Sequence, residues 1–211
     1  MINISVKSMR NKIIESDLKY ITNAELNWDI YKNKTVLVSG ASGFLPAYMV
    51  ETLLYLNETR QFNIRIIGLV RNLEKARERF LHYESSKYLQ IISQNVCDKI
   101  EIDEEIDYIV HAASLATPKY FSSDPVGTIS PNVIGTNNLL NLAVEKKVES
   151  FMYFSTSGVH GHVEESAYPV PEDCFGSLDP MDLASCYLES KRMGENMCVA
   201  WMHQYGVPIK I

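Results

Sequence analysis

Short apolar runs alternate with longer helical patterns along the chain from Thr35 to its last residue. The expected strands are residues 35–39, 64–70, 88–93, 107–111, 151–155 and 207–211. The expected helices are residues 44–56, 73–83, 132–146 and 183–205. Strands that alternate with helices of this length indicate parallel strands joined by right-handed crossovers. We therefore predict an α/β fold, a Rossmann-type doubly wound parallel sheet with helices on both faces.

Residues 1–33 precede this alternation and are expected to form an N-terminal helical extension, with residues 34–211 as the domain proper. Ile14, Leu18 and Ile21 recur at helical spacing with charged side chains between them. This spacing predicts a short amphipathic helix that packs on the domain or on a partner subunit.

Composition limits the classes of function. The 211 residues include 20 basic and 26 acidic side chains, and 46% of them are hydrophobic, which excludes a disordered or low-complexity chain. No apolar run approaches the roughly 20 residues that cross a bilayer, and residues 1–10 lack the apolar segment of a secretion signal. The net charge of −6 disfavours a general nucleic-acid binder. We expect a cytoplasmic protein whose partners include neither nucleic acid nor membrane.

Cysteine and histidine give no metal or disulfide framework. The four cysteines are sparse and form no C-x-x-C pair, so we expect free thiols in a reducing compartment. His160 and His162 have a spacing that could serve a metal, but no cysteine or carboxylate cluster completes a ligand set. We therefore predict no metal site.

Gly40 and Gly43 lie between the first expected strand and the first expected helix. A dinucleotide-binding turn needs this order, because the helix N-terminus must face a pyrophosphate with no Cβ in the way. Pro46 stands where the usual third glycine would be, which is tolerable in a first helical turn. The same two glycines also suit an ordinary tight turn.

The end of the second expected strand bears on the choice of cofactor. An acid there binds the ribose hydroxyls of NAD, and a base favours the 2′-phosphate of NADP. The chain has Arg71 and no acid at this point, so we predict NAD or NADP with a preference for NADP. The alternative is that Arg71 is a solvated arginine at a strand end.

Tyr187 and Lys191 form a Tyr-x-x-x-Lys pair on one face of the last expected helix. The lysine is expected to favour the phenolate and to lower the pKa of the tyrosine, which would let it exchange a proton with an alcohol. The spacing is weak evidence alone, because Tyr83 and Lys87 match it too. Tyr187 differs in following a strand whose end carries Thr156 between two serines.

From Thr35 onward the chain resembles the extended short-chain dehydrogenase/reductase superfamily, and within it the NAD-dependent epimerase/dehydratase family. The resemblance rests on blocks in the family's order: Ser-Gly-Ala-Ser-Gly-Phe (39–44), His-Ala-Ala-Ser (111–114), Asn-Val-Ile-Gly-Thr (132–136), Phe-Ser-Thr-Ser-Gly-Val-His-Gly (154–161) and Tyr-x-x-x-Lys (187–191). It implies an NAD(P)-dependent enzyme that oxidises C4 of a UDP- or dTDP-sugar to a 4-keto intermediate, and a homodimer by analogy.

The resemblance also implies roles for individual residues. The catalytic set would be Thr156, Tyr187 and Lys191, with Tyr187 as the base. The residues implied to contact the cofactor are Gly40, Ser42, Gly43, Phe44, Leu45, Arg71, Asn95, Val96, Ala112, Ala113, Ser114, Asn132, Tyr187 and Lys191.

Loops at 113–118, 124–125 and 172–176 are similar to those of the UDP-glucuronate decarboxylase subgroup. The chain departs from that subgroup at Gly158, where the decarboxylases have a glutamate, and at Ala184, where they have an arginine. The 4,6-dehydratases have Asp-Glu where this chain has Ser157 and Gly158, so an epimerase or a 4-ketosugar reductase fits better.

The length of the chain leaves further alternatives open. Family members continue beyond the point that corresponds to Ile211, so we expect a chain truncated before most of the part that binds the sugar nucleotide. The alternatives to an enzyme are a cofactor-binding module without turnover and an interaction protein with a vestigial site.

Overall fold

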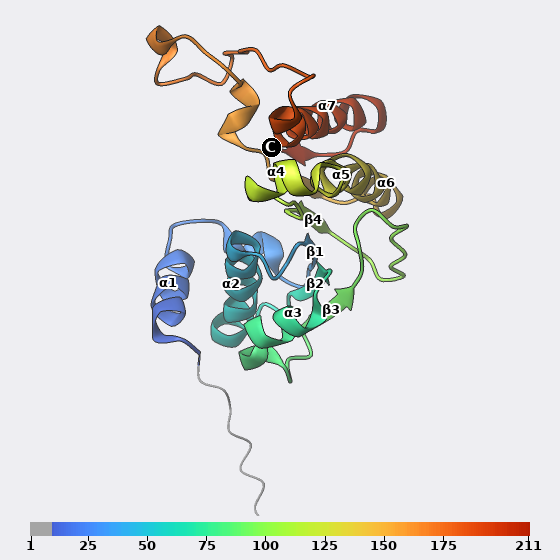
Figure 1. Cartoon of the computed structure of the whole chain (residues 1–211). Helices are drawn as coiled ribbons and strands as arrows, with labels where there is room; N and C mark the ends of the chain where they lie inside the picture. Colours follow the sequence, from blue (N-terminus) through green and yellow to red (C-terminus); the bar gives the residue numbers. More distant parts are fainter. Residues whose placement is uncertain (1–9) are drawn as a thin grey trace, which may run out of the picture.

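The computed structural model describes residues 10–211 and places six parallel strands in one sheet (Figure 1). Their order across the sheet is β3-β2-β1-β4-β5-β6, and the predicted Rossmann-type arrangement is thereby confirmed. The strands are β1 (Thr35–Ser39), β2 (Arg65–Val70), β3 (Leu89–Ser93), β4 (Tyr108–His111), β5 (Ser150–Tyr153) and β6 (Ile209–Lys210).

Helices cover both faces of the sheet. On one face α2 packs over Val36 and Val38 of β1, and on the other α6 packs over Leu37. The alternation follows from the pleat of the strand, which sends successive side chains to opposite faces. The helices are α1 (Lys12–Thr22), α2 (Phe44–Arg60), α3 (Leu73–Arg79), α4 (Lys119–Ser123), α5 (Pro125–Ser130), α6 (Thr136–Lys146) and α7 (Cys186–Tyr205).

The helix expected at residues 132–146 begins earlier than the sequence pattern indicates. Asp124 caps α5 by accepting a hydrogen bond from the Gly127 N–H, and Pro125 occupies the first helical position. Pro131 does not end the helix, because a π-helical turn, Pro131–Gly135, absorbs its missing N–H and leads into α6.

Two other expected elements are shorter than predicted. The helix expected at 73–83 ends as α3 at Arg79, and a separate 3-10 turn follows at Leu81–Tyr83. The strand expected at 207–211 pairs with β5 only at Ile209 and Lys210. The expected helix 183–205 begins with a 3-10 turn, Leu183–Ser185, before α7.

The helix expected in the N-terminal extension is α1, which packs against α2 and buries Leu18 completely. Residues 1–9 of that extension lie outside the described residues. The division of the chain at residue 33 stays a prediction. Within residues 10–211, no helix combines the length and apolar character needed to cross a membrane.

The strand order reverses direction between β1 and β4, which are neighbours in the sheet although β2 and β3 lie between them in the sequence. In an open α/β sheet, ligands bind in the crevice outside the carboxyl ends of the strands at this point. The turns after β1, β4 and β5 meet at that edge, so the fold brings together the segments that the sequence motifs occupy.

Candidate active site

The turn after β1 can be built only with glycine at its first position. Gly40 has φ +68°, and a Cβ there would lie 2.9 Å from the Cα of Ala113. Its N–H donates to the carbonyl of Leu69 (2.9 Å), and its carbonyl accepts from the N–H of Gly43 (2.8 Å). The turn is therefore closed on itself and pressed against the loop after β4.

The N-terminus of α2 follows this turn directly. Its N-cap is Gly43, which has no side chain to accept from the first helical turn. The side chains of Phe44 and Leu45 are exposed, and Pro46 is buried. An uncapped helix N-terminus beside a glycine turn fits a pyrophosphate, because its free N–H groups and the helix dipole favour an anion.

The loop after β4 supplies the opposite wall. Ala112, Ala113 and Ser114 are partly buried, and Ser42 is partly buried across from them in the glycine turn. The hydroxyl oxygen of Ser114 is buried and has no hydrogen-bond partner among the described residues. This orphan acceptor and donor lies at the edge where the predicted cofactor residues meet, which supports a polar ligand there.

The residues expected near the adenine of the cofactor differ in their exposure. Asn95 is exposed, and its side chain accepts from the N–H of Cys97 (3.1 Å). Val96 is buried in the core, where a Cβ on Gly135 would lie 2.7 Å from its Cγ2. Arg71 is exposed at the end of β2.

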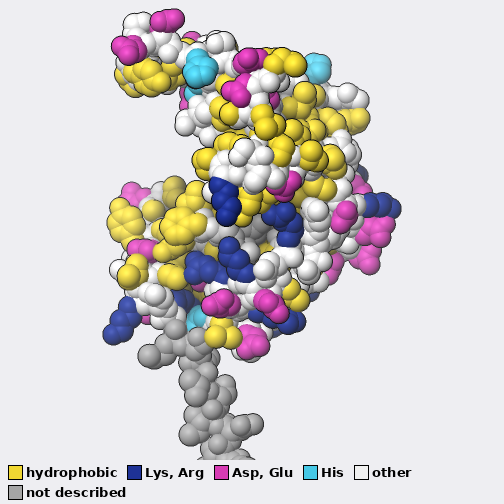
Figure 2. Space-filling view, in the orientation of Figure 1, with side chains coloured by type: hydrophobic (Ala, Val, Ile, Leu, Met, Phe, Trp, Pro, Cys, Tyr) yellow, Lys and Arg dark blue, Asp and Glu magenta, His cyan; other side chains and the backbone are white. Residues whose placement is uncertain are grey.

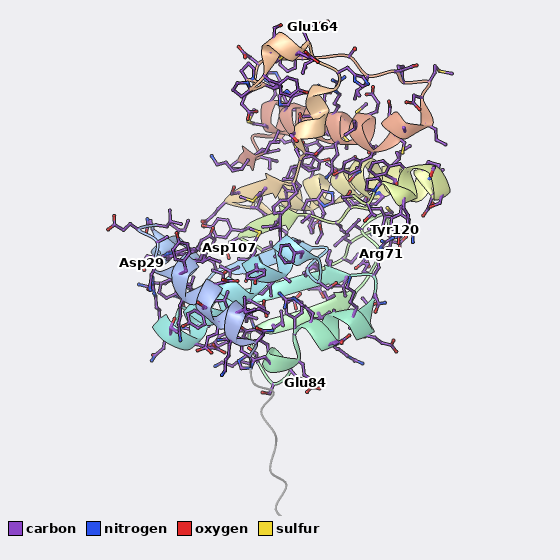
Figure 3. The ribbon with its side chains drawn as sticks, turned by 60° about the vertical axis from the view of Figure 1, so that its left-hand side comes forward. Asp29, Arg71, Glu84, Asp107, Tyr120 and Glu164 are labelled. Carbon is purple, nitrogen blue, oxygen red and sulfur yellow. The ribbon has the colours of Figure 1, made fainter. Side chains whose placement is uncertain are left out.

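A hollow opens on the face shown in Figure 2, between the half of the molecule that carries α4 and the half that carries α2 and α3, and Lys and Arg side chains gather around it. In Figure 3, Asp107, before β4, lies at the amino ends of the strands, and Arg71, after β2, lies at their carboxyl ends. Tyr120 of α4 lies on the same side of the sheet as Arg71. The positive charge is thus found at the carboxyl edge, where a phosphate-bearing ligand would bind.

Ser39 and His111 end two neighbouring strands and are joined by a buried contact that the sequence analysis did not assign to the site. The Ser39 hydroxyl oxygen accepts from the backbone N–H groups of Ala112 and Ala113, both at 3.2 Å, and lies 2.8 Å from His111 Nδ1. Two polar residues at the carboxyl ends of otherwise apolar strands were the available signal.

Asn132 is buried in the π-helical turn and contacts α7. Its side chain has no exposed surface, and its amide donates to the carbonyl of Thr128 (3.1 Å) and to the hydroxyl of Ser190 (2.9 Å). The side-chain oxygen of Asn132 is buried and has no hydrogen-bond partner among the described residues. Asn132 thus packs against α7 through Ser190, and its contact with a cofactor stays a prediction.

Tyr187 lies in the first turn of α7, and its side chain is 9% exposed. The ring of Phe121 stacks on it with centroids 4.8 Å apart and planes inclined by 10°. Burial raises the pKa of Tyr187, and a side-chain hydrogen bond with Thr156 acts in the opposite direction. Thr156 and Tyr187 are therefore brought together as expected.

Lys191 does not have the expected effect on Tyr187. Its Nζ donates to the carbonyl of Phe154 (2.5 Å) and lies 4.7 Å from the ring centroid of Tyr153. Burial lowers the pKa of Lys191 to about 8. The expectation that this lysine lowers the pKa of Tyr187 is wrong for this structure, because that pKa is raised by burial and the ammonium donates to Phe154.

Gly158 is the second residue of the short helical turn Ser157–His160, at the position where the sequence lacks a carboxylate. A Cβ there would lie 2.5 Å from Cδ2 of Leu188, the residue after Tyr187. The space beside Gly158 is thus filled by an apolar side chain from α7, and no acid can be added without moving it.

The histidine pair is not assembled as a metal site. His160 Nδ1 lies 2.8 Å from the carbonyl oxygen of Cys174, which fixes that nitrogen as a donor. No group of three or more potential ligands among His, Cys, Asp and Glu comes together within residues 10–211.

A sequence model of the NAD dependent epimerase/dehydratase family matches residues 36–211. UDP-glucuronic acid decarboxylase 1 of Danio rerio is 33% identical over 180 residues, which cover 84% of this chain and 40% of that protein. UDP-glucuronic acid decarboxylase 3 of Arabidopsis thaliana is 34% identical over 183 residues, with 85% and 49% covered. The chain spans less than half the length of these curated relatives.

Solved structures agree with the fold. UDP-glucuronic acid 4-epimerase from Bacillus cereus, in complex with NAD, superposes with a TM-score of 0.66 at 22% identity and covers 83% of this chain and 54% of its own. UDP-N-acetylglucosamine 4-epimerase from Methanobrevibacter ruminantium M1, in complex with UDP-N-acetylmuramic acid, superposes with a TM-score of 0.68 at 20% identity, with 84% and 53% covered.

Proposed function

Because the chain belongs to the NAD dependent epimerase/dehydratase family, we propose that it binds NAD or NADP and oxidises the C4 hydroxyl of a nucleotide sugar. One observation carries the proposal. The glycine turn follows β1, and Thr156 follows β5 with Tyr187 hydrogen-bonded beside it. Because all strands are parallel, these groups share one edge of the sheet.

In this proposal the dinucleotide is held at the turn between Gly40 and Gly43 and by the uncapped start of α2. The missing Cβ at Gly40 and the orphan hydroxyl of Ser114 support the fit, since both leave a polar ligand room and partners. When bound, the nicotinamide supplies the acceptor for a hydride from the sugar carbon. Arg71 supports a preference for NADP, because an arginine can bind a 2′-phosphate.

Tyr187 is the proposed base. Its hydroxyl would take the proton of the sugar alcohol, and Thr156 would hold that hydroxyl and stabilise the phenolate. The hydrogen bond with Thr156 already lowers the pKa of Tyr187 against the effect of burial. Lys191 stands one helical turn away and would add positive charge when it leaves the carbonyl of Phe154.

For the substrate we propose a UDP- or dTDP-sugar, which is supported by relatives named UDP-glucuronic acid decarboxylases and by a neighbour in complex with UDP-N-acetylmuramic acid. Gly158 favours a reaction that needs only the Thr, Tyr and Lys set. Epimerisation at C4 and reduction of a 4-ketosugar meet this condition, whereas decarboxylation and 4,6-dehydration would lack an acid at that point.

A nucleotide-binding unit without turnover is the second candidate function. It is favoured by the position of Lys191, whose ammonium donates to Phe154 and leaves Tyr187 with a raised pKa. Binding of NAD or NADP with no conversion of any nucleotide sugar would support this candidate.

We also propose a homodimer located in the cytoplasm. Exposed apolar side chains on α5 and the π-helical turn (Val126, Ile129 and Ile134) and on α7 (Val199 and Met202) support a subunit contact along these helices. The four free cysteines are consistent with a reducing compartment. Analytical ultracentrifugation of the purified chain tests the dimer, and a single monomeric species would contradict it.

Calorimetric titration with NAD and with NADP tests the cofactor, and incubation with UDP- and dTDP-sugars tests the reaction. The Tyr187→Phe variant should still bind the dinucleotide and should lose activity by a factor of about 100 or more, because the proton acceptor is removed. Full activity in this variant would contradict the role of Tyr187, and no binding by the folded wild-type protein would contradict the cofactor site.

A further inference from the structure

A series of buried hydrogen bonds, joined through the backbone and side chain of Asn132, runs from the end of β1 beside the glycine turn to the first turn of α7. Ser39 contacts His111 Nδ1 (2.8 Å), and His111 Nε2 contacts the hydroxyl of Thr136 (3.0 Å). Thr136 donates to the carbonyl of Asn132 (2.5 Å), and the Asn132 amide donates to Ser190 (2.9 Å).

The last link reaches the proposed base itself. The hydroxyl of Ser190 donates to the backbone carbonyl of Tyr187 (2.7 Å). None of the residues whose side chains form these hydrogen bonds is more than 4% exposed. Groups buried to this degree are costly to leave unpaired, so each link constrains the next.

Every hydrogen bond in this series is donated in the direction from Ser39 towards Tyr187. Burial lowers the pKa of His111 to about 3, so its ring is neutral and carries one N–H. Nε2 carries that hydrogen, because it also lies 3.2 Å from the carbonyl oxygen of Pro131, which can only accept. Nδ1 therefore accepts from the hydroxyl of Ser39, whose oxygen in turn accepts from the N–H groups of Ala112 and Ala113.

His111 is also connected to Lys191 by packing. Its ring centroid lies 5.7 Å from that of Tyr153, and the Nζ of Lys191 lies 4.7 Å from the same Tyr153 centroid. A Cβ on Gly194 of α7 would lie 2.1 Å from the Tyr153 hydroxyl oxygen, so the Tyr153 ring packs directly against α7 at this glycine. Two separate routes thus lead from His111 to the residues proposed for catalysis.

We propose that His111 is a positioning residue that fixes the glycine turn relative to the first turn of α7, which carries Tyr187. It acts through Ser39 on one side and through Thr136, Asn132 and Ser190 on the other. The inference rests on the proposed function only in assigning a dinucleotide to the turn. Its consequence is that a change at one end of this series of hydrogen bonds alters the other end.

Thr136→Val tests the middle of this series of hydrogen bonds, and Thr52 offers a matched control. Thr136 and Thr52 are both buried, and each donates from its hydroxyl to the carbonyl four residues earlier in its helix, at 2.5 and 2.7 Å. Only Thr136 also accepts from His111. Thr52→Val therefore removes the same chemical group and the same local hydrogen bond outside the chain.

The first readout needs no dinucleotide. In protein with ¹³C-labelled tyrosine rings, the signal of Tyr187 is assigned by its loss in Tyr187→Phe, and its ionisation is followed with pH. Thr136→Val and Ser39→Ala should each shift this signal and its titration midpoint, and Thr136→Ser should restore it. An unchanged Tyr187 signal in both folded variants, or an equal change in Thr52→Val, would overturn the proposal.

The second readout is the dissociation constant of NAD, measured by calorimetry. Thr136→Val should weaken binding by about five-fold, the loss expected for one buried hydrogen bond, and Thr52→Val should leave it unchanged. Equal affinity in the two variants would contradict the link to the glycine turn. If the wild-type protein binds no NAD, the proposed function fails. The Tyr187 signal of the nucleotide-free protein still decides whether a change at Ser39 or Thr136 reaches Tyr187 through the hydrogen bonds.

Discussion

The ring of Phe121 lies flat on the phenol of Tyr187, with centroids 4.8 Å apart and an inclination of 10° between the planes. Phe121 belongs to α4, and its carbonyl accepts from the thiol of Cys186 at the start of α7 (3.6 Å). The proposed base is therefore covered by a short helix that the sequence pattern did not predict. Burial of the phenol is the larger cause of its raised pKa.

Replacement of Phe121 by alanine should lower the pKa of Tyr187 towards its ordinary value, because water reaches the phenol and solvates the phenolate. Phe121→Leu is the control, since it keeps an apolar cover and loses the stacking. The measurement is a pH titration of the Tyr187 ring signal in the three proteins. A pKa that stays as high in the alanine variant as in the wild type would mean that other groups bury the phenol.

Alanine substitutions at two glycines with positive φ distinguish the cost of backbone strain from the cost of a steric clash. Gly206→Ala should cost only about 1 kcal/mol, because φ is +71° there and nothing lies within 4 Å of the new Cβ. Gly40→Ala should cost about 3 kcal/mol or more and should abolish dinucleotide binding, because its Cβ would lie 2.9 Å from the Cα of Ala113. Denaturant unfolding and calorimetry provide both measurements. Equal stability losses would contradict the close packing of the turn.

Arg71 decides the preference between the two dinucleotides in our proposal. The side chain is exposed at the end of β2, and the next residue, Asn72, caps α3 by accepting from the N–H of Lys75 (2.8 Å). Arg71→Ala should weaken NADP by about ten-fold, the loss of a charge-assisted contact at an exposed site, and leave NAD nearly unchanged. If both dinucleotides weaken equally, or neither does, Arg71 has no part in selecting the 2′-phosphate.

The sheet and the glycine turn were predictable from the sequence because their signals are local. The apolar run 35–39 and the glycines at 40 and 43 specify a strand and a turn without reference to any distant residue. The start of α5 had a local signal as well, since Asp124 and Pro125 form an N-cap followed by a first-turn proline.

The contacts of Lys191 and Asn132 could not be predicted in this way. The i, i+4 spacing gives the face of α7 on which Lys191 lies, but the carbonyl that accepts from its ammonium belongs to Phe154, the residue after β5, and is brought there by tertiary packing. Asn132 lies in a motif, yet its burial depends on the approach of Ser190 from α7. Long side chains choose partners across elements, and sequence spacing within one element does not fix that choice.

Neutral His111 should make stability depend on pH in a definite direction. The pKa of its ring is about 3 in the folded protein and 6.5 when unperturbed, and burial is the larger cause, followed by the charge of Lys191. The unfolded chain therefore binds a proton between these values that the folded protein excludes. The contribution of His111 to stability is complete above pH 6.5 and is lost progressively as the pH falls towards 3.

His111→Gln tests this, because glutamine keeps a donor for Thr136 and does not titrate. Between pH 6 and 5 the free energy of unfolding of the wild type should fall more steeply than that of the variant, by roughly 1 kcal/mol per pH unit, the value for about one proton. Urea unfolding at both pH values measures the difference between the slopes, so the other titrating groups cancel. Parallel slopes would mean that the His111 ring is protonated in the folded protein, and Nδ1 would then donate to the Ser39 hydroxyl instead of accepting from it.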